Sequence, residues 1–166
     1  IAISPAKLMV GGRGTFWASL GLYILSARPM TTTELLWPAL ITALAALLYL
    51  VLVINVGRAR AKYGIMPPAT TGDENFERVL RVQYNTLEQL AFFLPGLWLF
   101  ALYRDPTIAA ILGAIWLLGR ILYAWGYYQA PEKRMVGFAL GSLSSMILVV
   151  GALLSILWQL RQLSQF

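Results

Sequence analysis

Residues 76–88 read FERVLRVQYNTLE and continue without a break into QLAFFLPGLWLFALY, residues 89–103. On a helix, Arg78, Arg81, Asn85 and Glu88 are spaced by three, four and three residues, so they share one stripe. A polar stripe in a membrane-length helix has to face other protein or a water-filled cavity, because each ionisable group costs at least ~2.5 kcal/mol in hydrocarbon. The stretch therefore predicts a site inside a helical membrane protein.

The composition of the whole chain indicates the same class. Of 166 residues, 59% are hydrophobic and 12% are charged, whereas an average soluble protein is roughly 25% charged. Four apolar stretches each exceed the ~20 residues that cross a bilayer, and none shows the alternation of a membrane barrel. We therefore predict an all-α membrane protein, with a four-helix transmembrane bundle in residues 30–166 and helices at about 35–60, 76–103, 107–128 and 133–160.

Residues 1–29 are less informative. Their apolar segment, FWASLGLYIL at residues 16–25, is too short to span a bilayer and follows Lys7 and Arg13, as a signal-peptide core would. Met30 and the TTTE that follows it are typical of a second start with a threonine cap. Two interpretations stay open, namely residues added or translated upstream of the protein proper, and an interfacial helix.

The chain has no cysteine and no histidine. Thiol nucleophiles, histidine-based triads, disulfides and the common zinc ligand sets are therefore excluded, and we expect no metal site. Any chemistry has to rest on arginine, tyrosine, glutamate or asparagine side chains, or on a bound cofactor. The net charge of +6 predicts anionic partners, either lipid headgroups or a small acidic ligand, and nothing indicates nucleic acid binding.

A second polar stripe is expected in the third helix. The string GRILYAWGY at residues 119–127 places Arg120, Tyr123 and Tyr127 three and four residues apart. A tight turn at residues 104–107, with Asp105 as the helix cap, makes the second and third helices antiparallel neighbours. The two stripes therefore lie at the same level of the membrane.

Basic residues predict the orientation of the helices. The loops after the first and third helices carry five of them, Arg58, Arg60, Lys62, Lys133 and Arg134, whereas from Met30 onward the other side has Arg104 and Arg161. The positive-inside rule places the two basic loops, and with them both polar stripes, on the cytoplasmic side.

One end of the bundle thus collects many polar residues: Arg60, Arg78, Arg81, Arg120 and Arg134, together with Gln83, Asn85, Glu88, Tyr123 and Tyr127. One interpretation is a set of buried ion pairs, such as Arg81 or Arg120 with Glu88. Five arginines facing so few carboxylates, however, leave positive charge that is costly in a low-dielectric environment unless an anion is bound. The sequence therefore predicts a multiply anionic ligand.

Three strings carry a family resemblance: PPATTG at residues 67–72, FERVLRVQYNTLE at 76–88 and GRILYAWGY at 119–127. They resemble the MAPEG family of membrane-associated eicosanoid and glutathione proteins, in its microsomal glutathione S-transferase and leukotriene synthase branch. The resemblance extends over essentially everything after Met30. It implies a homotrimer of four-helix subunits that binds glutathione between subunits near the cytoplasmic face and acts on hydrophobic electrophiles or lipid hydroperoxides arriving from the membrane lipids.

The resemblance also assigns residues. It implies glutathione contacts from Arg81, Asn85, Glu88, Arg120, Tyr123 and Tyr127, interface contributions from Arg60 and Gln83, and a supporting role for Arg78. Arginines suit the two carboxylates of glutathione, and Glu88 suits its ammonium group. Arg134 matches the catalytic arginine that faces the sulfur, where it would stabilise a thiolate with help from the positive end of a helix. The alternative for Arg134 is a charge that anchors the loop beside Lys133.

Two departures from the family pattern bear on the activity. Ala61 stands where the leukotriene synthases have a second arginine, and Gln89 stands where they often have an aromatic residue. We therefore expect a broad glutathione transferase with peroxidase activity rather than a leukotriene synthase. Two other classes are a non-catalytic lipid-binding scaffold of the same fold and a transporter, and the far halves of the helices lack the ionisable path that transport needs.

Overall fold

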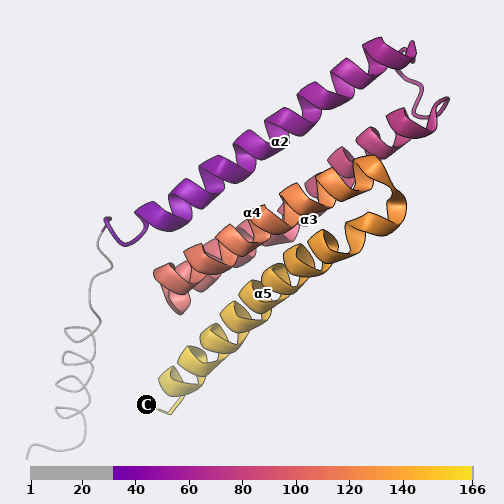
Figure 1. Ribbon diagram of the computed structural model, residues 1–166. Coiled ribbons are helices and arrows are strands. Elements are labelled where there is room, and N and C mark those ends of the chain that lie inside the picture. The colour runs from indigo at the N-terminus through magenta and orange to yellow at the C-terminus, as the bar shows by residue number, and fades with distance from the viewer. Residues whose placement is uncertain (1–31, 166) are drawn as a thin grey trace, which may run out of the picture.

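The computed structural model describes residues 32–165, and in them four long helices form an up-and-down bundle without strands. The helices are α2 (Leu36–Tyr63), α3 (Glu74–Tyr103), α4 (Pro106–Gln129) and α5 (Met135–Leu163), with a short 3-10 turn η1 (Pro131–Arg134) before α5. In Figure 1, α3 and α4 lie between α2 on one side and α5 on the other. The prediction of an all-α four-helix bundle is confirmed, while the expectation for residues 1–29 lies outside the described residues.

All four helices are long and apolar enough to cross a membrane. Their outward faces expose large aliphatic side chains, such as Leu47 and Leu50 on α2 and Leu153 and Leu154 on α5. Such faces are stable against hydrocarbon and costly in water. Helix composition and outward faces together identify an integral membrane protein.

Short polar side chains fix where α3 and α4 begin. The carboxylate of Asp73 accepts hydrogen bonds from the backbone N–H groups of Asn75 (2.8 Å) and Phe76 (3.1 Å), and Asp105 accepts one from Ile108 (2.7 Å). Each satisfies a donor that the first turn of a helix leaves open. The cap expected at Asp105 is confirmed.

Two expected helix boundaries differ from the structure. The first helix ends at Tyr63 because Gly64 adopts the left-handed conformation (φ 66°), so it stops before the prolines at 67 and 68 are reached. The last helix begins at Met135 rather than at about 133, because Pro131 starts a tighter turn in which the Lys133 N–H bonds to Ala130 O (3.1 Å). Arg134 is therefore the N-cap residue of α5 and does not lie within its first turn.

Small residues let α4 and α5 approach closely. A Cβ atom built at Gly137 would lie 2.6 Å from Gly119 O, and one built at Gly119 would lie 2.7 Å from Gly141 N. Gly137, Gly141 and Ser145 are all buried against α4 or the core. These small residues therefore form a packing surface, as small residues do in many membrane helix pairs.

We expect Gly137→Ala to destabilise the bundle, because its methyl group would overlap the backbone of α4. The loss should be about 2 kcal/mol or more, measured as a lower midpoint of thermal unfolding in detergent. Gly57→Ala is the matched control, since a Cβ there meets nothing within 4 Å and alanine favours a helix by about 1 kcal/mol. Equal midpoints for the two variants would contradict this packing.

Candidate functional site

A small cleft lies where α3, α4 and the start of α5 meet. It has a volume of about 200 Å³ and is lined by Arg81, Asn85, Tyr123, Arg134, Met135 and Phe138. Three separate helices thus bring four of the predicted site residues to one place. Arg81, Asn85 and Tyr123 come from the predicted stripes and Arg134 from the turn before α5, while Met135 and Phe138 add an apolar wall.

A larger cleft of about 530 Å³ adjoins it near the α2–α3 loop and η1. Its lining includes Arg78, Arg81, Tyr84 and Tyr127, with Glu74 and Glu77 also on its wall. Arg81 lines both clefts and is exposed. Its guanidinium is therefore accessible from both spaces.

Arg120 lies beneath the small cleft instead of lining it. It is 1% exposed, and its Nη1 donates to Asn85 Oδ1 (3.2 Å) while its Nη2 donates to Thr86 Oγ1 (2.6 Å). Its guanidinium also stacks over the ring of Tyr123 at 4.1 Å. Arg120 therefore holds two residues that line the cleft, Asn85 and Tyr123, and adds positive charge behind them.

The aromatic residues extend this arrangement toward Arg134. Tyr123 stacks with Tyr127 at 5.6 Å between ring centroids, and the Arg134 guanidinium lies 5.0 Å from the Tyr127 ring. Cation–π contacts of this kind attract a guanidinium without neutralising its charge. Arg134 thus remains a full positive charge at the N-terminal end of α5, next to the cleft.

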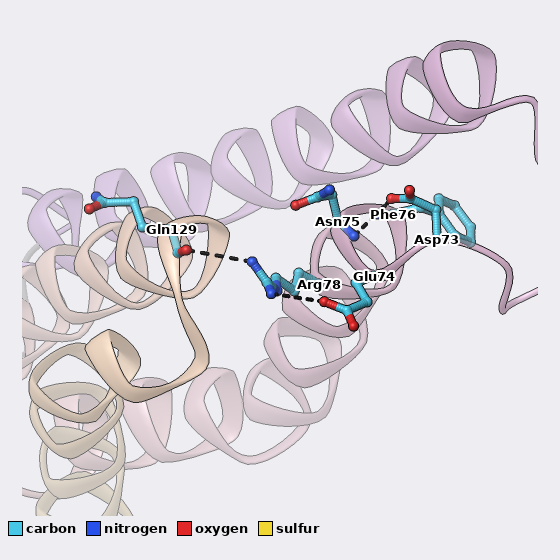
Figure 2. A network of polar contacts seen from close by, with 6 residues as sticks. All are labelled: Asp73, Glu74, Asn75, Phe76, Arg78 and Gln129. Atoms are coloured by element: carbon cyan, nitrogen blue, oxygen red, sulfur yellow. Dashed lines mark hydrogen bonds and ion pairs between the residues drawn. The ribbon is translucent and has the colours of Figure 1, made fainter.

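An ion pair joins Arg78 Nη2 and Glu74 Oε2 at 3.4 Å. Arg78 also donates to Gln129 O at 3.5 Å, as Figure 2 shows, so it ties the start of α3 to the end of α4. Glu88 accepts a hydrogen bond from Asn85 Nδ2 (3.4 Å) and pairs with neither Arg81 nor Arg120. The ion pairs proposed as the alternative interpretation therefore do not form within this chain.

Two predicted site residues lie away from the cleft. Arg60 donates to Ile65 O (3.3 Å) and Ala69 O (2.9 Å) and lies over the ring of Phe76, so it orders the α2–α3 loop. Gln83 donates to the hydroxyl of Tyr49 on α2. Within one chain, neither residue is brought to the cleft that Arg81 and Arg134 line.

Three residues of the site were missed from the sequence. Thr86 belongs to neither predicted stripe, yet its hydroxyl accepts the shortest hydrogen bond of Arg120. The signal in the sequence is a hydroxyl group among the apolar residues of that helix face. Met135 and Phe138 form the wall of the cleft. Nothing in the sequence distinguishes these two from lipid-facing residues.

Comparison with known proteins shows to which family the sequence is similar. The sequence profile described as "MAPEG family" matches residues 38–154. Uncharacterized protein sll1147 of Synechocystis sp. is 93% identical over 137 residues, which are 82% of this chain and all of that protein. Microsomal glutathione S-transferase 2 of Homo sapiens is 42% identical over 101 residues (60% and 69% of the two chains), and leukotriene C4 synthase of Bos taurus is 32% identical over 119 residues (72% and 79%).

We expect Thr86→Val to destabilise the protein by about 1–3 kcal/mol, because a guanidinium N–H of Arg120 would lose its buried acceptor. Thermal unfolding in detergent measures the change. Thr42→Val is the matched control, since the Thr42 hydroxyl bonds only to Pro38 O, four residues earlier in its own helix. A loss of stability as large in Thr42→Val would show that Arg120 does not depend on Thr86.

Proposed function

The chain belongs to the MAPEG family, and we propose that it is a membrane-bound glutathione S-transferase that ionises glutathione to its thiolate and conjugates it to hydrophobic electrophiles. One observation carries this proposal: Arg81 and Arg134 line one cleft, and neither forms an ion pair among the described residues. Unpaired positive charge in a low-dielectric site favours an anionic ligand. Glutathione supplies two carboxylates and an acidic thiol.

Each polar residue has a role in this proposal. Arg81 and Asn85 hold a carboxylate of glutathione, and Glu88, beside Asn85, receives its ammonium group. Arg120 does not line the cleft but orients Asn85 and Tyr123, which do. Tyr123 and Tyr127 form the aromatic side of the site, on which Arg134 rests.

Arg134 is the proposed catalytic residue. A guanidinium is already protonated and so cannot take the thiol proton itself, but its charge stabilises the thiolate and so lowers the pKa of the bound thiol. The released proton goes to solvent through the cytoplasmic opening. The thiolate then attacks an electrophilic carbon, a carbon–sulfur bond forms, and the leaving group departs or, for an addition, the product takes a proton from water.

The same thiolate supports reduction of lipid hydroperoxides. Two glutathione molecules and one hydroperoxide give glutathione disulfide, the lipid alcohol and water, so the peroxide is reduced at the expense of the two thiols. The chain has no cysteine of its own. Glutathione is therefore both the reductant and the source of the nucleophile in this proposal, and no metal takes part.

We further infer a homotrimer whose glutathione sites lie between subunits. Within one chain, Arg60 and Gln83 lie away from the cleft, although the family resemblance assigns them to the same ligand. Contribution from a neighbouring subunit reconciles these two facts. The basic residues of the two loops beside the site support a position at the cytoplasmic face.

Arg134→Ala should abolish the ultraviolet thiolate absorbance that appears when glutathione is mixed with the purified protein, while glutathione still binds. The conjugation rate with 1-chloro-2,4-dinitrobenzene should fall by ~100-fold, because the bound thiol would stay protonated. Lys133→Ala removes an adjacent charge that bonds to Gln129 and should leave the thiolate intact. If Arg134→Ala formed thiolate as well as the wild type, the catalytic assignment would be wrong.

Mixed trimers test the position of the site between subunits. Arg81→Ala should lose glutathione binding, and so should a Gln83→Ala, Arg60→Ala double variant. Co-expression of these two inactive chains should restore activity, because some sites would combine an intact Arg81 with intact Arg60 and Gln83 from a neighbour. A complete lack of complementation in mixed trimers, verified by two purification tags, would place each site within one chain.

A further inference from the structure

A polar pair lies one helical turn below the small cleft, between α3 and α5. Gln89 Nε2 donates to Ser142 Oγ at 3.4 Å. Gln89 follows Asn85 by four residues on α3, and Ser142 follows Phe138 by four residues on α5. Residues four apart share a helix face and are about 6 Å apart along its axis. The pair is therefore at the end of the cleft that points into the membrane.

The two helices run in the same direction and keep one register through this region. Gln89 and Ser142 are 53 positions apart in sequence, and Gly96 lies against Val149 with the same separation. Arg81 and Arg134, and Asn85 and Phe138, share this separation and line the cleft together. The Gln89–Ser142 pair thus lies along the same α3–α5 contact as the cleft, one helical turn further on.

Buried polar atoms at this level lack partners. Gln89 is 7% exposed, and its Oε1 accepts no hydrogen bond from any residue in the described range. Ser145, one turn deeper on α5, is 0% exposed, and its Oγ is equally unpaired among residues 32–165. Each such atom costs about 1–3 kcal/mol relative to a paired one, a cost that a leucine at either position would avoid. The Gln89 oxygen is therefore a buried acceptor without a donor among the described residues.

We propose that Gln89 and Ser142 form a subsite for the electrophilic substrate, an oxygenated acyl chain. The subsite binds an O–H group of that chain, which is a hydroxyl or hydroperoxyl group close to the reacting atom. Gln89 Oε1 accepts from this O–H, and the Ser142 hydroxyl, which is only half-buried, donates to its oxygen. Met135 and Phe138 provide the apolar wall between the subsite and Arg134. The inference rests on the proposed function, since it names which hydrophobic acceptors that site prefers.

Apolar contact alone does not distinguish electrophiles that carry an O–H group from electrophiles that lack one, whereas this subsite does. A purely hydrophobic pocket discriminates poorly against an added hydroxyl, whereas a site whose buried polar groups need a partner favours the ligand that supplies it. Acceptors without an O–H group, such as halogenated aromatics, leave the Gln89 oxygen unpaired. Their reaction kinetics should therefore not depend on Gln89 and Ser142.

The test compares two electrophiles that differ by one hydroxyl group, 4-hydroxy-2-nonenal and 2-nonenal. Gln89→Leu should raise the KM for 4-hydroxy-2-nonenal by ~10-fold at unchanged kcat and leave the kinetics with 2-nonenal unchanged. Ser142→Ala should act in the same direction, and Ser142→Thr, which keeps the hydroxyl, should restore the wild-type KM. Ser144→Ala is the matched control, because Ser144 is buried on α5 but lies off this face.

Two further readouts separate the possible failures. The thiolate absorbance of bound glutathione should be unchanged in Gln89→Leu, which shows that the variant is folded and that its glutathione site is intact. Quenching of tryptophan fluorescence measures binding of each enal without glutathione, and there too the hydroxylated enal should bind the wild type about 10-fold more tightly than it binds Gln89→Leu. Equal changes for both enals, or none for either, overturn the subsite. A wild type that forms no thiolate overturns the proposed function instead, while the binding comparison still decides the subsite.

Discussion

The structure depends on how a positive charge is held inside a membrane bundle. Arg120 is almost fully buried, and within residues 32–165 it has hydroxyl, amide and aromatic partners but no carboxylate. Neutral partners accept hydrogen bonds from Nη1 and Nη2 without cancelling the charge of the guanidinium, so the surrounding region stays electropositive. Arg81 and Arg134 add to this potential at the same end of the bundle. A bundle of this kind is stabilised by any ligand that brings negative charge to the cleft.

The arrangement of the helices concentrates this charge at one end. The N-terminal halves of α3 and α5 and the C-terminal half of α4 meet there, while the opposite halves form a core of aliphatic and aromatic side chains, including the stacked pair Phe93 and Trp116 (3.9 Å between ring centroids). Close packing of α4 on α5 through glycines keeps the three helix ends together. The apolar half anchors the protein in lipid, and the polar half is left free to bind a small hydrophilic ligand beside the membrane.

Much of the fold was predictable from the sequence because a membrane-spanning helix requires a long, continuous apolar segment. Apolar length predicted the four helices, and Asp105 predicted the start of α4. The boundaries at Gly64 and Met135 were missed because a left-handed glycine and a 3-10 turn are decided by local backbone geometry. For the site, periodicity grouped Arg81 with Asn85 and Arg120 with Tyr123, but it did not distinguish a residue that lines a cleft from one that supports it. Arg120 and Thr86 belong to the second kind, which depends on how α3 packs against α4.

Proton release on glutathione binding tests the central claim most directly. Glutathione is added to the detergent-solubilised wild type in weakly buffered solution near neutral pH, and a pH indicator reports the protons set free. If the unpaired arginines convert the bound thiol into a thiolate, about one proton per occupied catalytic site should appear together with the binding signal. Saturable binding with no proton release would contradict the account, because glutathione would then be held as an unreactive thiol.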